Sequence, residues 1–212
     1  MGFQKNVELF KNNTPYDVER YAKINNKSNL LGVSFNSQTC ANKDTKLVIV
    51  GTYTPKKGRE NGYFYTSSRV NYTYRIIDDY FGLNGELTSK KEYLSEHKKD
   101  AQTIIEIKNI LTSLNIAFID VIDFAISPDD CANDDEIEYF CLDNKTFNVV
   151  NDKTIFVCNS RNSEYAFKTM FPSKICEYAT QKRQCKSYDW HYNNWEIVLD
   201  KYYDRDMKCW KI

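Results

Sequence analysis

The sequence predicts an α/β fold, a three-layer α/β/α sandwich around a short, mostly parallel four-stranded sheet. Three short apolar runs, each ended by glycine or polar residues, have the continuous hydrophobicity of strands that are buried on both faces. Segments with helical periodicity separate these runs, and such alternation is typical of α/β proteins. Glycine (7) and proline (4) are too few for the closely spaced turns of a β-sandwich or a propeller.

The expected elements follow in chain order. Buried strands are predicted at residues 46–51, 116–122 and 154–158, with a fourth around 174–178. Helices are predicted at residues 71–81, 100–114, 162–171 and 190–203. The helix at 100–114 carries an apolar stripe that we expect to face the core, made of Ile104, Ile105, Ile107, Ile110 and Leu111.

A length of 212 residues is enough for one sizeable core but short for two full domains, so a single domain over 1–212 is expected. Residues 1–45 are predicted to form a polar N-terminal extension, with a helix at 16–24 and an Asn-rich loop, packed on a core of 46–212. Residues 82–100 have a charged helical pattern, and residues 127–138 have the composition of an acidic loop. Solvated connections are the favoured interpretation of all three segments.

The composition excludes several classes of protein. Lys plus Arg and Asp plus Glu both number 29, and 42% of residues are hydrophobic, which is globular and not disordered composition. No apolar run approaches the roughly 18 residues of a membrane span, so no membrane partner is expected. The N-terminus lacks the apolar region of a secretory signal, which predicts a cytoplasmic protein, or a nuclear one in a eukaryote.

The cysteines do not form a metal or redox motif. Seven cysteines are scattered along the chain without a Cys-x-x-Cys pair, and His97 and His191 are the only histidines. We therefore expect no metal site and no cofactor, and we expect reduced, mostly buried thiols.

In an open parallel sheet, ligands bind at the carboxyl ends of the strands, so the loops after Gly51, Asp120 and Cys158 are the candidate sites. The first of these loops mixes aromatic, hydroxyl and cationic side chains and has neither a Walker ending nor a Gly-x-Gly-x-x-Gly motif. Aromatic residues among cations can stack a base and pair with its phosphates. The cations concerned are Lys56, Lys57, Arg59 and Arg69. An ordinary surface loop is the alternative.

Four motifs follow one another over residues 46–200. A buried strand runs into a Gly-led loop at 47–55 (Leu-Val-Ile-Val-Gly-Thr-Tyr-Thr-Pro), and an Asn followed by aromatic residues opens a helix at 69–74 (Arg-Val-Asn-Tyr-Thr-Tyr). A strand then ends in Asp120 before an acidic loop, and a later strand is followed by Asn159 and a helix. In this order and spacing the segments resemble the uracil-DNA glycosylase superfamily, most closely its mismatch-specific and hypoxanthine-type branches.

The resemblance implies base removal, in which the base is flipped out, held in a pocket and attacked by water at a sugar carbon that resembles an oxocarbenium ion. Asn71 is expected to orient that water, as the matching Asn does in the hypoxanthine-type branch. Asn71 can also cap the following helix, and both roles are compatible. A carboxylate at the end of the second strand, Asp120 or Asp123, could activate water or hold a loop by hydrogen bonds. For Asp120 the loop anchor is the favoured interpretation.

The base pocket is expected around the first loop. Tyr53 and Tyr65 are the preferred stacking platforms, ahead of Tyr72 and Tyr74, although each aromatic residue is by itself more often part of a core. Backbone amides at Gly51 and Thr52 would stabilise negative charge on the departing base. Asn159 would hydrogen-bond the base edge, or alternatively cap the helix that begins near residue 162.

The sequence departs from the superfamily in two places. Relatives carry a Pro-Ser loop that grips DNA, whereas residues 178–186 here are basic and amide-rich, so Lys182 and Arg183 are expected to bind phosphate. Tyr53 and Thr54 stand where uracil-specific branches position water with Asp or Asn. Uracil is therefore no better supported than hypoxanthine or a modified pyrimidine, such as those of viral DNA.

The predicted function is that of a monofunctional DNA glycosylase, because no strand-end lysine could serve as the buried amine of a strand-nicking enzyme. The expected partner is double-stranded or single-stranded DNA, the expected state is a monomer, and an iron-sulfur cluster is not expected. The role would be repair or defence against foreign DNA. The alternative is a catalytically inactive, glycosylase-like module that binds DNA or protein, and a third possibility is an unrelated α/β enzyme acting on a small nucleotide.

Overall fold

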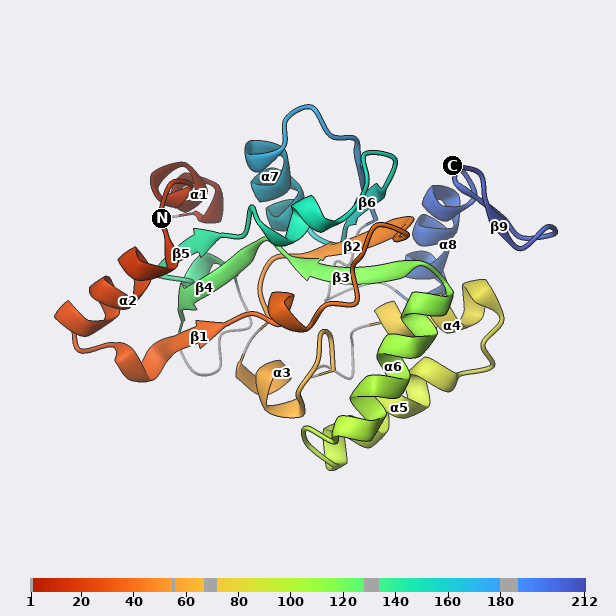
Figure 1. The fold of residues 1–212 in the computed structure, drawn as a ribbon, viewed down its shortest axis with the longest axis horizontal. Helices are drawn as coiled ribbons and strands as arrows, with labels where there is room; N and C mark the ends of the chain where they lie inside the picture. Colours follow the sequence, from red (N-terminus) through yellow and green to blue (C-terminus); the bar gives the residue numbers. More distant parts are fainter. Residues whose placement is uncertain (1, 55, 67–71, 128–133, 180–186) are drawn as a thin grey trace.

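The computed structural model describes residues 2–54, 56–66, 72–127, 134–179 and 187–212 (Figure 1). Its centre is a four-stranded parallel sheet in the order β3-β2-β6-β7. The strands are β2 (Leu47–Gly51), β3 (Ile116–Asp120), β6 (Ile155–Cys158) and β7 (Cys176–Tyr178). The predicted fold class is confirmed, since helices flank both faces of this sheet.

Alternate residues of each strand point to opposite faces, so the sheet separates two apolar clusters. On one face, Leu47 and Ile49 pack with α4 (Thr73–Phe81), α5 (Glu86–Glu96), α6 (Ala101–Ser113) and α8 (Tyr188–Leu199). On the other face, Val48 and Val50 pack with α1 (Phe3–Phe10) and α7 (Arg161–Met170). Figure 1 shows α1 and α7 across the sheet from α5 and α6.

The predicted helices are present with shifted ends. Helix α8 ends at Leu199 and not at residue 203, because Tyr203 belongs to a terminal hairpin of β8 (Tyr203–Asp204) and β9 (Cys209–Trp210). On α6, Ile107 and Leu111 are fully buried, but Ile105 is 50% exposed. The expectation that Ile105 faces the core is therefore wrong: the buried face of α6 runs through Thr103, Ile107 and Leu111, and position 105 lies outside it.

A second sheet was not predicted. The strand expected over 116–122 ends at Asp120, and the chain pairs again from Ile122 in an antiparallel sheet of order β1-β4-β5. Its strands are β1 (Leu31–Val33), β4 (Ile122–Ile126) and β5 (Tyr139–Leu142). Helix α2 (Pro15–Ile24) packs on β4 and β5.

Residues 1–45 are therefore not a solvated connection. They supply α1, α2 and β1, and Phe3, Val7 and Val18 are at most 1% exposed. Helix α2 begins where the local sequence dictates, because Thr14 accepts a hydrogen bond from the Asp17 amide, the Asp17 carboxylate accepts one from the Thr14 amide, and Pro15 occupies the first turn. Residues 82–100 contain α5, whose Leu87 and Leu94 are fully buried.

In the part of the chain that the structure describes, the remaining short elements are α3 (Lys56–Asn61) and 3₁₀ turns at Ser28–Leu30, Asn36–Gln38, Asp134–Glu136 and Thr146–Val149. Within the described ranges, no helix has the length and apolar character that crossing a membrane requires.

Candidate functional site

The carboxyl ends of β2, β3 and β6 lie side by side and bring several of the predicted site residues together. Gly51, the last residue of β2, is in register with Asp120, the last residue of β3. On the other side of β2, the backbone N–H of Asn159 donates a hydrogen bond of 3.1 Å to the Val50 carbonyl. This is the edge of a parallel sheet at which ligands bind in α/β proteins.

Two polar side chains are packed directly over Gly51. A Cβ atom at this position would lie 2.2 Å from Asp120 Oδ1 and 2.5 Å from the Tyr65 hydroxyl oxygen. Neither atom belongs to a flexible chain end in open space, because Asp120 is 1% exposed and the Tyr65 hydroxyl is buried. Only glycine therefore allows the carboxyl of β3 and the phenol of the first loop to meet at the end of β2.

Asp120 joins two of these segments. Its Oδ2 accepts a hydrogen bond of 2.5 Å from Thr54 Oγ1, which ties the loop after β2 to the end of β3. Burial raises the pKa of Asp120 from 3.8 to about 7, and the negative charge of Asp134 acts in the same direction. The described part of the acidic segment thus lies within electrostatic reach of the strand ends.

Asn36 is a site residue that the sequence analysis did not identify. Its side-chain oxygen accepts a hydrogen bond of 2.8 Å from the Asp120 amide, and its Nδ2 donates to the Asp120 carbonyl at 2.7 Å. The same Nδ2 also donates to Asp143 Oδ2 at 2.7 Å. Asn36 is 2% exposed, so this buried amide holds the end of β3 in place from outside the central sheet.

Tyr65 has an unusual backbone conformation. Its φ of +56° is in the left-handed region, which bulky residues avoid and which costs on the order of 1–3 kcal/mol. The ring packs edge-on against Phe118, with centroids 5.1 Å apart. Its hydroxyl is buried and has no hydrogen-bond partner of normal geometry among the described residues, although Asn159 lies close to it. Burial raises the pKa of Tyr65 well above its usual range, so the phenol is a neutral donor.

Tyr53 and Arg59 form a second contact in the same loop. Arg59 Nη1 donates to the Tyr53 hydroxyl at 2.6 Å and to the Thr54 carbonyl at 2.9 Å. The pair covers Gly32 in β1, where a Cβ would lie 2.1 Å from the Tyr53 hydroxyl. Arg59 belongs to helix α3, which begins at Lys56, so the expectation that Lys56 and Lys57 lie in a surface loop is wrong: they open a short helix. The structure describes only the backbone of these two lysines.

Thr52 and Asn159 flank the start of α7. Thr52 Oγ1 lies 3.0 Å from Ser160 Oγ, and Ser160 caps α7 by accepting a hydrogen bond from the Ser163 amide. The alternative in which Asn159 caps this helix is therefore wrong, and the 8% exposed Asn159 side chain is left near Tyr65. Tyr74 is fully buried, with its hydroxyl donating to the Phe64 carbonyl at 2.8 Å, and is a core residue.

Four of the predicted site residues lie outside the described residues: Asn71, Arg69, Lys182 and Arg183. Their roles stay predictions, as do the contacts of Lys56 and Lys57 with phosphate. Among the residues that the structure describes, no three His, Cys, Asp or Glu side chains are grouped as metal ligands.

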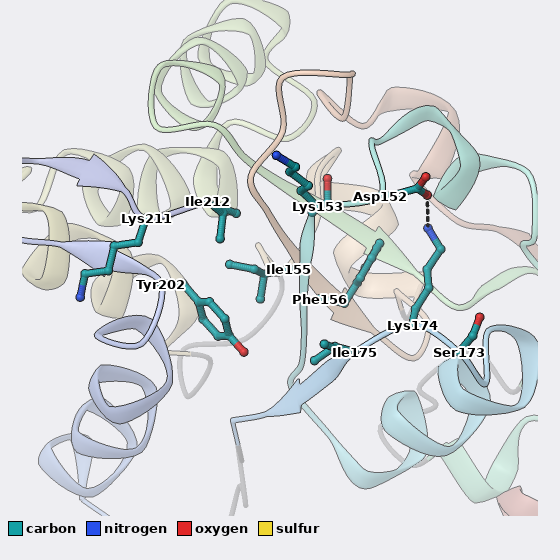
Figure 2. A pocket seen from close by; sticks show the side chains of 11 residues that line it. Asp152, Lys153, Ile155, Phe156, Ser173, Lys174, Ile175, Tyr202, Lys211 and Ile212 are labelled. Atoms are coloured by element: carbon teal, nitrogen blue, oxygen red, sulfur yellow. Dashed lines mark ion pairs between the residues drawn. The ribbon is translucent and has the colours of Figure 1, made fainter.

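A cavity of about 730 Å³ opens at the other end of β6 (Figure 2). Ile155, Ile175, Tyr202 and Ile212 form its apolar wall, and Lys174 and Asp152, which pair at 3.9 Å, also line it. The strand-end residues Gly51, Asp120 and Asn159 are not among its lining residues. This cavity is therefore separate from the candidate site.

No protein-family model matches the sequence, and no significant match was found among curated proteins. The structure is similar to the solution NMR structure of a Methanosarcina acetivorans protein named "putative Uracil DNA glycosylase", with a TM-score of 0.55 at 14% sequence identity. The similarity covers 81% of this chain and 96% of that one. At this identity the likeness shows the fold, an α/β architecture shared by the two proteins.

Proposed function

We propose that this protein is a monofunctional DNA glycosylase, which hydrolyses the N-glycosidic bond of a damaged or modified base that has been flipped out of DNA. The observation that carries the proposal is the meeting of Asp120, Tyr65 and Asn159 around Gly51, at the carboxyl ends of three adjacent parallel strands. The fold shared with the Methanosarcina protein supports it.

The groups gathered there suit recognition of a base. A flipped base is read by hydrogen bonds to its edge and by stacking on a flat face. The Tyr65 hydroxyl is a buried donor without a hydrogen-bond partner of normal geometry in the described ranges, and the side-chain amide of Asn159 beside it supplies both a donor and an acceptor. The strain at Tyr65 is consistent with a residue held in place for binding.

Asp120 is assigned a positioning role in this proposal. Its carboxyl already accepts the Thr54 hydroxyl, and its backbone is held by Asn36, so we assign it to supporting the site and not to contact with substrate. It holds the loop that carries Thr52 and Tyr53 against the end of β3. Asn71 is the proposed catalytic residue, which orients the attacking water, and Arg69, Lys182 and Arg183 are proposed to contact phosphates.

The proposed substrates are hypoxanthine, a modified pyrimidine or uracil. The Thr54 hydroxyl donates a hydrogen bond to Asp120, and the Tyr53 hydroxyl accepts one from Arg59. Neither position therefore offers the carboxylate or amide with which uracil-specific branches position water. This supports a pocket that is not restricted to uracil. The proposed role is DNA repair or the removal of modified bases from foreign DNA.

An inactive module that binds DNA or protein is the second candidate. A formal net charge of zero and the absence of a Pro-Ser pair at 178–186 favour it, because phosphate neutralisation supplies most of DNA affinity. In addition, the Arg59 guanidinium is engaged within the protein.

The two candidates are separated by an abasic-site assay. Duplexes and single strands carrying uracil, hypoxanthine or modified cytosines are incubated with the purified protein and then treated with hot alkali, which cleaves at abasic sites. Cleavage that depends on the protein and on alkali, from at least one substrate, is expected. Binding to the same DNA with no cleavage on any substrate would overturn the catalytic proposal in favour of the binding module.

A further inference from the structure

Two cysteine side chains of the central sheet are nearly in bonding contact. Cys158 Sγ, at the end of β6, lies 2.8 Å from Cys176 Sγ, at the start of β7. Non-bonded carbon atoms stay about 3.5–4.0 Å apart, and sulfur is larger than carbon. A disulfide bond measures about 2.05 Å, so the two sulfur atoms are already well inside non-bonded contact.

The sheet register explains why the two thiols meet. Cys176 is in register with Phe156, and Cys158 is in register with Tyr178. The two cysteines are therefore offset by two positions on neighbouring strands, which places both side chains on the same face of the sheet. On this face they pack against the apolar side of α7, through Ala166 and Phe167.

The two cysteine residues differ in exposure. Cys158 is fully buried, and burial raises the pKa of its thiol well above the usual range. Cys176 is half-buried, so we expect a small oxidant from solvent to react with it before it reaches Cys158. The Lys168 ammonium of α7 interacts electrostatically with both thiols and would stabilise a thiolate, while Glu164, paired with Lys168, opposes ionisation of Cys158.

We infer that Cys158 and Cys176 are a modification site, at which a peroxide forms a reversible disulfide between β6 and β7. The Cys176 thiolate attacks one oxygen of hydrogen peroxide, the O–O bond breaks, and a sulfenic acid and a hydroxide form. The Cys158 sulfur then attacks the Cys176 sulfur and displaces its hydroxyl group. With the two thiol protons, the displaced oxygens leave as two water molecules, so two sulfurs are oxidised and one peroxide is reduced.

A disulfide between Cys158 and Cys176 would link β6 covalently to β7 next to the candidate site. Cys158 directly precedes Asn159 and Ser160, and its carbonyl already accepts a hydrogen bond of 3.1 Å from the Ala179 amide. A disulfide would add a covalent link at the same place and fix the end of β6 to β7. The inference does not depend on the proposed function, because the bond forms whether or not the strand ends bind DNA.

The test uses the purified full chain, fully reduced and then treated with hydrogen peroxide. The chain is then unfolded in denaturant, and all free thiols are blocked with N-ethylmaleimide before mass spectrometry and peptide mapping. We expect two fewer labelled cysteines than in the reduced protein, a mass loss of about 2 Da before labelling, and a peptide that links residues 158 and 176. Treatment with a thiol reductant should restore both labels.

Two serine variants provide the controls. Cys176→Ser is expected to abolish the link, whereas Cys209→Ser, which changes the exposed cysteine of β9, is expected to leave it unchanged. Peptide mapping of the unmodified sequence needs no variant, so the test survives if Cys176→Ser fails to fold. Labelling of all seven cysteines after peroxide, or a linked peptide that joins other cysteines, would overturn the inference.

Discussion

Thr54 Oγ1 donates a hydrogen bond of 2.5 Å to Asp120 Oδ2, and this contact joins two segments that are 66 positions apart in the sequence. The acceptor is a fully buried carboxyl whose backbone is held on the other side by Asn36. The loop after β2 is therefore fixed to the end of β3 by a titratable group. The free energy of unfolding of the protein should for this reason depend on pH.

The raised pKa of Asp120 should make the folded protein less stable as pH rises. The pKa of Asp120 is about 7 in the folded protein, whereas its ordinary value of 3.8 applies to the unfolded chain. Between these pH values the folded state therefore holds a proton that the unfolded state has lost. The contribution of Asp120 to the free energy of unfolding must then fall as pH rises from about 4 to 7, by up to about 4 kcal/mol. Asp120→Asn removes this dependence.

Guanidinium unfolding of the wild-type protein and Asp120→Asn at pH 5 and pH 8 measures the effect. The variant should gain stability relative to the wild-type protein as pH rises. Because the Asn side chain still accepts from Thr54, base release should fall by less than about tenfold. A loss of 100-fold or more would instead identify Asp120 as the general base.

Gly51→Ala tests the close packing at the end of β2. The new methyl group would meet Asp120 Oδ1 and the Tyr65 hydroxyl, and such overpacking should lower the free energy of unfolding by about 1–3 kcal/mol. Gly2→Ala is the matched control, because nothing lies within 4 Å of its Cβ. Equal denaturation midpoints for the two variants would contradict the described geometry.

Tyr65→Phe separates a binding role from a structural one. The hydroxyl that is removed has no hydrogen-bond partner of normal geometry among the described residues, so stability should be unchanged or rise by up to about 1 kcal/mol. Tyr74→Phe, which loses the hydrogen bond to the buried Phe64 carbonyl, should instead cost about 1–2 kcal/mol. If the Tyr65 hydroxyl contacts the base, Tyr65→Phe should slow base release at least tenfold while Tyr74→Phe does not.

Asn36→Ala is expected to be strongly destabilising. It leaves the Asp120 amide and carbonyl and the Asp143 carboxylate without their buried partner, at a cost of about 2–4 kcal/mol. Asn12→Ala, at an exposed position, should change stability by no more than about 0.5 kcal/mol. Chemical denaturation of both variants measures the difference, and similar midpoints would argue against the proposed support of β3.

The central sheet could be predicted from the sequence because its strands are continuous apolar runs that end in glycine or polar residues. The antiparallel sheet could not, since β1 has only three residues and the half-buried residues in the middle of β4 hide any regular alternation. Because ligands bind at the carboxyl ends of parallel strands, Gly51 and Asp120 could be predicted as site residues from the sequence. Asn36 was missed because an Asn in a polar segment has no local signal that it will be buried against β3.

The most direct test of the proposed function compares the wild-type protein with Asn71→Ala on the best substrate of the abasic-site assay. Single-turnover base release and affinity for the duplex are measured on the same samples. We predict that Asn71→Ala binds DNA with unchanged affinity and releases the base at least 100-fold more slowly. Equal rates of release in the two proteins, or no release by the wild-type protein from any DNA tested, would contradict the account.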